Sequence, residues 1–321
     1  MPLKLLPKVA RSSMNLRPTS FTEFQGKAEI KRNLQIFINS AQKQKRNLDH
    51  CLIYGLPGTG KTSLATIIAN EMHRKIKIIQ GGNIIHNSDI INLVLSIDEG
   101  DLIFIDEIHA MNPQCIELLY TIMEDFALDI TIGKEFNSKV TRISVPQFTL
   151  IGATTRLGKL PLPFEERFSI TLNLKEYAID ELVAILRFAS QKIALALNDQ
   201  ELQLIASNCK NIPRNAIKII KRIFDFRNCH PELSVASILK KLKYYENGLD
   251  QNDFEYLSAL ANQKQAVGLK TLSQIVNIDQ ETIELKIEPY LITNNYILKT
   301  NKGRILTEKG SNFIQNNKKH K

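Results

Sequence analysis

Two short motifs in the first third of the chain contain the residue types that ATP hydrolysis requires. Residues 55–62 read Gly-Leu-Pro-Gly-Thr-Gly-Lys-Thr. In this pattern backbone N–H groups surround phosphate oxygens, the lysine reaches the β- and γ-phosphates, and the last hydroxyl binds Mg²⁺. Residues 102–107 read Leu-Ile-Phe-Ile-Asp-Glu, an apolar strand that ends in two carboxylates, which such enzymes use to hold the metal and orient a water. An apolar strand precedes the first motif and forms the start of the second. Together the two motifs predict an ATP-hydrolysing protein.

The elements around these motifs have the pattern of a parallel sheet covered by helices. Short apolar runs alternate with amphipathic stretches from residue 51 to residue 177, which is typical of α/β folds. Apolar residues at helical spacing after Lys61 predict that the first motif opens a helix whose positive end faces the phosphates. Strands are predicted at 51–54, 76–80, 102–105, 148–151 and 170–174.

Residues 127–145 differ from this pattern and predict a β-hairpin inserted before the fourth strand. Leu128, Ile130 and Ile132 alternate with polar neighbours, and residues 133–138 offer turn chemistry. The segment is either an ordinary edge hairpin or, as an apolar projection from an ATPase core, a docking surface for a partner protein.

The chain is long enough for more than one hydrophobic core, and three domains are predicted. An ATPase domain is expected at 1–177 and a small helical domain at 178–247, where strand signals stop. Residues 248–321 predict three helices followed by a two-stranded hairpin, a winged-helix arrangement. Lys299, Lys302 and Arg304 flank the predicted wing, where contacts with DNA phosphates would lie.

Composition restricts the class of protein further. The net charge of +9, from 42 basic and 33 acidic residues, favours an anionic partner such as nucleic acid. The 4 cysteines form no C-x-x-C pair, as expected in a reducing cytoplasm, and the 6 histidines do not cluster with them as zinc ligands would. No apolar run approaches the roughly 18 residues of a membrane span. The absence of acidic residues before Glu23 would suit a transit peptide, but we favour a basic arm that folds onto the nucleotide domain.

Further stretches make the chain similar to the RuvB family, the hexameric AAA+ ATPases that drive branch migration of Holliday junctions in bacterial recombination and repair. The matching stretches are 16–18, 55–62, 104–109, 123–125, 150–156, 166–168, 213–214 and 288–292. The phosphate loop and the Asp-Glu strand are common to all AAA+ proteins. The Asp-Glu-Ile-His, Gly-Ala-Thr-Thr-Arg and Glu-Pro-Tyr-Leu-Ile stretches resemble this family in particular.

The resemblance implies roles for individual residues. The implied nucleotide-binding residues are Leu16, Arg17, Gly58, Gly60, Lys61, Thr62, Ser63, Glu124, Asp125, Phe126, Tyr177 and Arg214. The implied catalytic residues are Lys61, Asp106, Glu107, Thr155 and Arg167, with Thr62 and Asp106 on Mg²⁺. Glu107 would act as general base and Thr155 as the sensor of the γ-phosphate, although Thr154 is nearly as good a sensor. Arg167 would be an arginine finger for the neighbouring subunit; its alternative is a surface salt bridge with Glu165 or Glu166.

The resemblance also implies a fold and partners. The fold would be an AAA+ P-loop core with a parallel sheet, a small helical lid and a C-terminal winged helix. ATP and Mg²⁺ would be the cofactors of a homohexamer in the cytoplasm, with no membrane contact. The hexamer would move duplex DNA of a Holliday junction, contacted through Lys299 and Arg304, and would act with RuvA docked on the 127–145 hairpin.

The sequence departs from the family pattern at Ala110, Glu165, Asn211-Ile212 and Gln280. Asn211-Ile212 replaces a common Gly-Thr and alters the turn before Pro213, which otherwise suits the first position of a helix and aims Arg214 toward the cleft. Glu165 replaces an arginine, so a nearby contact between subunits is expected to differ. Gln280 replaces a basic residue, which predicts weaker contact with DNA.

Two other functions fit parts of this pattern. A clamp-loader subunit or a replication initiator would share the AAA+ core. Assembly as a hexamer of like subunits, rather than as a mixed pentamer, would distinguish the branch-migration motor from these proteins. A nucleotide-gated DNA-binding scaffold would hydrolyse little ATP. The presence of both Glu107 and Arg167 argues for catalysis.

Overall fold

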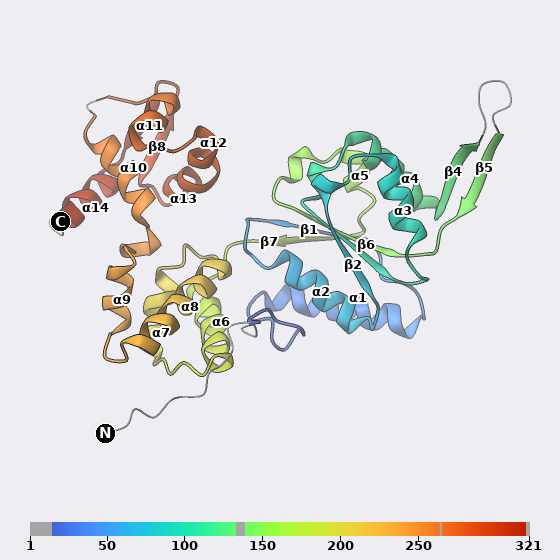
Figure 1. Cartoon of the computed structure of the whole chain (residues 1–321), viewed down its shortest axis with the longest axis horizontal. Helices are drawn as coiled ribbons and strands as arrows, with labels where there is room; N and C mark the ends of the chain where they lie inside the picture. Colours follow the sequence, from blue (N-terminus) through green and yellow to red (C-terminus); the bar gives the residue numbers. More distant parts are fainter. Residues whose placement is uncertain (1–14, 133–138, 264, 319–321) are drawn as a thin grey trace. The chain divides into compact units, whose positions relative to one another are not determined.

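In the computed structural model the described residues are 15–132, 139–263 and 265–318, and they form two compact units (Figure 1). The first unit runs to Ala196 and also includes Ile212–Ile217. The second comprises Leu197–Asn211 and the chain from Lys218 onward. The predicted domain boundaries at residues 177 and 247 stay a prediction, because the segment between them is divided between the two units.

A five-stranded parallel sheet forms the centre of the first unit, in the order β2-β3-β6-β1-β7. The strands are β1 (Cys51–Gly55), β2 (Ile76–Gln80), β3 (Leu102–Asp106), β6 (Thr149–Thr154) and β7 (Ile170–Leu174). The sequence placed the fourth strand at 148–151, whereas β6 continues to Thr154. Because parallel strands end at the same edge, the carboxyl ends of β1, β6 and β3 deliver both motifs to one place.

Helices cover both faces of this sheet (Figure 1). They are α1 (Ala28–Lys43) and α2 (Lys61–Glu71) on one face and α3 (Asn87–Leu95), α4 (Pro113–Asp125) and α5 (Leu162–Glu165) on the other. Successive strand residues enter different cores: Ile53 and Phe104 pack with α1 and α2, while Leu52 and Ile103 pack with α3 and α4. Burial of both faces explains why these strands are continuous apolar runs. The helix α6 (Ile179–Lys192) follows β7.

The predicted hairpin is present as the antiparallel pair β4 (Ala127–Ile132) and β5 (Lys139–Ser144). The pairing runs from Ala127 opposite Ser144 to Ile132 opposite Lys139. It projects from the core of the first unit (Figure 1). The predicted turn at 133–138 lies outside the described residues.

The second unit contains the predicted winged helix. Its elements are α7 (Asp199–Ser207), α8 (Pro213–Cys229, which begins in the first unit), α9 (Val235–Lys241), α10 (Gln251–Ala261), α11 (Leu269–Val276), α12 (Gln280–Thr282), a π-helical turn η7 (Ile283–Ile287), α13 (Glu288–Thr293), β8 (Ile297–Thr300) and β9 (Gly303–Leu306). Gly303 closes the wing turn at a φ of +132°, and a Cβ there would lie 2.4 Å from the carbonyl oxygen of Val267. Only glycine therefore permits the bridge between Val267 and Arg304.

A helix that the sequence did not predict closes the second unit. Residues 308–318 form α14 (Glu308–Lys318), whose Phe313 and Ile314 are buried in the core of the winged helix. The Phe313 ring meets Tyr296 edge-on, with centroids 5.8 Å apart. The segment is rich in basic residues, which indicated a solvated tail, so the sequence did not predict that these two residues are buried.

Candidate nucleotide site and DNA-binding wing

The phosphate loop lies between β1 and α2, and its lysine is folded back onto it. Lys61 is 6% exposed, and its Nζ donates to the carbonyl oxygens of Gly55 at 2.9 Å and Leu56 at 3.0 Å. Burial lowers the pKa of Lys61, while the nearby carboxylates of Glu107 and Asp106 act in the opposite direction. A phosphate at the amino end of α2 would offer this ammonium a better, charged acceptor.

The metal-binding residues predicted from the sequence are in contact. The Thr62 hydroxyl donates to Asp106 Oδ2 at 3.2 Å across the edge of the sheet. Among the described residues, no group of three or more His, Cys, Asp or Glu side chains could hold a metal. Mg²⁺ next to phosphates uses only one or two protein oxygens and keeps several waters. A hydroxyl and a carboxylate therefore fit this ion in the presence of a nucleotide.

Tyr177 and Arg214, which the family resemblance predicts to close over the nucleotide, both contact the phosphate loop. The Tyr177 hydroxyl donates to the carbonyl oxygen of Thr59 at 3.0 Å, and the Arg214 backbone N–H donates to that of Gly58 at 3.2 Å. A Cβ on Gly58 would lie 2.7 Å from Arg214 Cβ, so the glycine leaves room for this approach. Asn211 has a φ of +58°, a conformation that glycine adopts freely and asparagine more readily than most residues. Asparagine is therefore compatible with the backbone of the turn before Pro213.

Glu107, which directly follows β3, is held by Thr155, the residue that directly follows β6. Its Oε2 accepts hydrogen bonds from the Thr155 N–H at 3.2 Å and the Thr155 hydroxyl at 2.9 Å. The neighbouring Thr154 is fully buried, and its Oγ1 lies 2.9 Å from Nδ1 of His109. Of the two sensor candidates, only Thr155 thus contacts the proposed base directly. His109 belongs to the turn η3 (Ile108–Ala110) and was not assigned a role from the sequence.

Arg167 does not contact the phosphate loop; its described partners are on α4. Its Nη2 donates to the Tyr120 hydroxyl at 2.5 Å and pairs with Glu124 Oε2 at 3.1 Å. The guanidinium also lies over the Tyr120 ring, 4.6 Å from the centroid. The ion-pair partner is therefore Glu124, where the sequence reading considered Glu165 and Glu166. Tyr120 was missed, although its position four residues before Glu124 puts both on one helix face.

The other predicted nucleotide contacts are spread over the first unit. Asp125 pairs with Arg142 of β5 at 2.6 Å, and the Phe126 ring meets Phe148 edge-on at 5.7 Å. Leu16 is buried, whereas Arg17 is exposed. Ser63 is half-buried in the first turn of α2. Gly60 directly precedes that helix and has a φ of +105°.

The two predicted DNA contacts of the wing have different surroundings. Lys299 is 52% exposed at its side chain and pairs with Glu284 at 3.2 Å. Arg304 is only 8% exposed; it donates to both carboxylate oxygens of Glu288, at 2.7 and 3.0 Å, and to Glu284 at 3.1 Å. Tyr256 donates to the same Glu288 at 2.7 Å. These bonds raise the pKa of Arg304 and hold the wing to α13.

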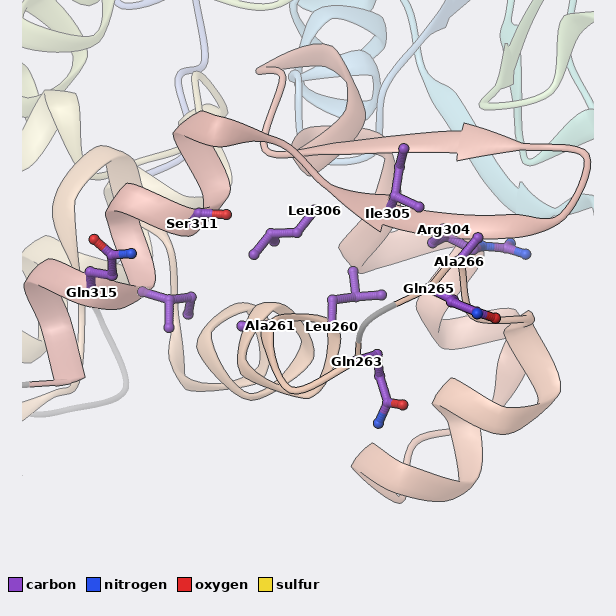
Figure 2. Close-up of a pocket in the computed structure, with 11 residues that line it drawn as sticks. Leu260, Ala261, Gln263, Gln265, Ala266, Arg304, Ile305, Leu306, Ser311 and Gln315 are labelled. Carbon is purple, nitrogen blue, oxygen red and sulfur yellow. The ribbon is translucent and has the colours of Figure 1, made fainter.

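A cavity of about 490 Å³ opens in the second unit (Figure 2). It is lined by the end of α10, by β9 and by α14, with Leu260 and Leu306 at its centre and Gln263 and Gln315 among its polar residues (Figure 2). Among its described lining residues only Arg304 is charged. None of the predicted nucleotide-binding residues lines it.

Comparisons with known proteins agree with this arrangement. Residues 16–174 match the family model described as the P-loop domain of the Holliday junction DNA helicase RuvB, and residues 246–315 match the RuvB C-terminal winged helix domain. The chain is 46% identical over 308 residues to the Holliday junction branch migration complex subunit RuvB of Ureaplasma urealyticum, covering 96% of this chain and 98% of that protein. Identity to the protein of the same name from Mycoplasma genitalium is 43% over 299 residues, covering 93% and 97%.

Solved structures give the same result. The Thermotoga maritima RuvB Holliday junction branch migration motor is 32% identical, with a TM-score of 0.81, over 94% of this chain and 98% of that one. A solved point mutant of the same motor is 33% identical, with a TM-score of 0.82, over the same shares of the two chains. No helix within the described part of the chain is long and apolar enough to cross a membrane.

Proposed function

Because this chain belongs to the RuvB family, we propose that it is the ATP-hydrolysing motor that drives branch migration of Holliday junctions in recombination and repair. The observation that carries this proposal is the meeting of three strand ends in the first unit. They bring the lysine of the phosphate loop, the Thr62–Asp106 pair and the Thr155–Glu107 pair together. These are the groups that phosphoryl transfer to water needs, since its catalysis consists mainly of positioning and charge stabilisation.

Each side chain would act at a definite atom during hydrolysis. Lys61 would exchange the carbonyl oxygens of its own loop for the β- and γ-phosphate oxygens. Thr62 and Asp106 would hold Mg²⁺, which would neutralise charge on the phosphates when bound. Glu107 would accept a proton from the attacking water. Thr155 would donate a hydrogen bond from its hydroxyl to the γ-phosphate. Arg214 and Tyr177, already against the loop, would close over the nucleotide.

The position of Arg167 supports a shared active site in a ring of like subunits. Its guanidinium is bound to Tyr120 and Glu124 of α4, while the loop's contacts in the same chain come from Tyr177 and Arg214. A finger that does not reach its own loop would serve the loop of a neighbouring copy. We therefore propose that like subunits form a homohexamer in which Arg167 completes the active site of the neighbouring subunit. Glu124, its ion-pair partner, would lie at the same interface.

The winged helix would contact the duplex through phosphates, because a motor must move along any sequence. The exposed Lys299 and Lys302 of the wing would make those contacts. Arg304 would hold the wing in place through Glu288 rather than reach a phosphate from its buried position. The partner RuvA would dock on the projecting hairpin β4–β5. The buried thiols of Cys51 and Cys115 suit the cytoplasm as the site of action.

The test is ATP turnover of the purified protein with and without duplex DNA, together with its mass in solution with ATP and Mg²⁺. We expect a ring of six like subunits whose hydrolysis rises with DNA. Assembly with other chains into a pentamer would indicate a clamp loader instead. Nucleotide and DNA binding without turnover, even with a junction and RuvA present, would indicate a nucleotide-gated scaffold.

A further inference from the structure

An ion pair between Lys27 and Glu181 joins the start of α1 to the start of α6. The Lys27 backbone N–H donates to Glu181 Oε1 at 2.7 Å, and Lys27 Nζ donates to Glu181 Oε2 at 3.2 Å. The two side chains are only 12% and 23% exposed. Lys27 has a φ of +52°, a left-handed conformation that residues other than glycine adopt rarely. Such a conformation persists only where the surrounding contacts hold it, which indicates that this ion pair is a firm part of the fold.

The same ion pair fixes the backbone on both sides of Tyr177. Lys27 Nζ donates to the carbonyl oxygen of Glu176 at 2.7 Å. Glu181 Oε2 accepts the backbone N–H of Ala178 at 3.0 Å. The Lys27 ammonium also lies over the Tyr177 ring, 4.0 Å from its centroid, which is within the range of a cation–π contact. Tyr177, which is buried, is therefore held through its ring and through both neighbouring residues.

The Tyr177 hydroxyl in turn determines the direction of a peptide group in the phosphate loop. It donates to the carbonyl oxygen of Thr59 at 3.0 Å. The peptide group between Thr59 and Gly60 is trans, and because peptide groups are planar, its C=O and its N–H point in opposite directions. The Gly60 N–H therefore points away from the Tyr177 hydroxyl, at the residue that directly precedes α2. In a phosphate loop, backbone N–H groups bind the phosphate oxygens.

We propose that Lys27 is a positioning residue of the nucleotide site: with Glu181 it holds Tyr177 where the hydroxyl keeps the Gly60 N–H turned toward a phosphate of the bound nucleotide. This inference rests on the proposed function of the loop as the ATP site. Without the hydroxyl contact the peptide group after Thr59 would be free to rotate. The loop would then lose a preset donor to a charged acceptor, and nucleotide affinity would fall.

The affinity of the full chain for a fluorescent ADP analogue tests this role. Tyr177→Phe removes only the hydroxyl, and Lys27→Met removes only the ammonium from a chain of similar length. We expect each variant to bind the analogue about tenfold more weakly, as for one lost hydrogen bond to a charged group. Lys27→Met should cause no further loss in the Tyr177→Phe background, because both changes act through one hydroxyl. Unchanged affinity in either single variant, or losses that add, would overturn the proposal.

Lys192→Met is the matched control. Lys192 pairs with Glu23 at 3.0 Å and so also joins α6 to the segment before α1, but it is the last residue of α6, at the end far from Tyr177. Its substitution should leave the affinity as in the wild type. An equal loss in Lys192→Met and Lys27→Met would indicate general docking of α6 and overturn the role of Tyr177.

Two further measurements keep the outcomes distinct. If Lys27→Met unfolds, Glu181→Gln takes its place, with the same expected loss and the same absence of further loss in the Tyr177→Phe background. Absence of analogue binding by the wild-type protein would refute the nucleotide site and the role of Lys27 with it. Normal binding by the wild type and by Lys27→Met would refute only the role of Lys27.

Discussion

The hydroxyl and the backbone N–H of Thr155 donate to the same oxygen of Glu107, at 2.9 and 3.2 Å. The proposed phosphate sensor and the proposed base are therefore joined by two hydrogen bonds. One hydroxyl proton cannot serve both Glu107 and a phosphate oxygen. Arrival of the γ-phosphate would thus remove the hydroxyl hydrogen bond from Glu107 and leave the bond from the Thr155 N–H. The carboxylate would then have a free lone pair for the attacking water when there is a phosphate to attack.

Glu107→Gln tests the base without dismantling these contacts. The amide oxygen can still accept both hydrogen bonds from Thr155, but it cannot take a proton from water. We expect kcat to fall by about 10²–10⁴-fold, the usual contribution of a general base, while ATP binding and ring assembly persist. Steady-state turnover, nucleotide affinity and solution mass check this, with the exposed Glu29→Gln as control. Turnover equal to that of the control would remove Glu107 from its role.

The separation of Arg167 from the phosphate loop leads to a complementation experiment. Arg167→Ala alone should lose about 10³–10⁵-fold in turnover, as arginine fingers do, and Lys61→Ala alone should be equally inactive. In mixed rings some interfaces combine the intact loop of the first variant with the intact finger of the second. We expect activity to reappear in proportion to such interfaces when the variants are mixed and reassembled. If mixtures at every ratio remain inactive, the finger does not act in trans.

Arg304 is predicted to matter for folding of the winged helix. Its ion pair with Glu288 is buried on both sides, with 8% and 3% exposed, so Arg304→Gln leaves an uncompensated carboxylate beside Tyr256. Breaking such a pair costs about 3–5 kcal/mol. Chemical denaturation of the full chain, followed by near-ultraviolet circular dichroism, should show an earlier transition than in the wild type. A coincident unfolding curve would contradict the structural role.

Lys299 carries the opposite prediction, because its side chain is half-exposed on the wing. Lys299→Gln should leave the unfolding curve within about 0.5 kcal/mol of the wild type, as surface substitutions usually do. It should weaken duplex binding on every sequence and reduce the slope of log K against log salt by roughly 0.9, the loss of one phosphate contact. Binding isotherms at several salt concentrations measure the slope. An unchanged slope would locate the DNA contact elsewhere in the chain.

The sequence predicts this site where local order decides the geometry, and fails where distant contacts do. That Asp106 and Thr62 meet follows from parallel strands ending at one edge of the sheet, whatever the loops between them. The burial of Arg304 against Glu288 depends on how the wing packs on α13, which no local pattern reveals. The same applies to Tyr120 under Arg167, which joins two segments 47 residues apart.

The four cysteines provide a reagent test of the fold as a whole. Cys51, Cys115 and Cys209 are buried and Cys229, at the end of α8, is exposed. Burial raises the pKa of the Cys209 thiol to about 12 and raises the pKa of Cys51 and Cys115 as well. Since the thiolate is the reactive form, a raised pKa lowers the reactive fraction at pH 8. We expect maleimide to label one thiol per native chain and four in denaturant, with Cys229→Ser removing the native label. Rapid labelling of a second thiol, located by mass spectrometry, would show that the described packing around that cysteine is wrong.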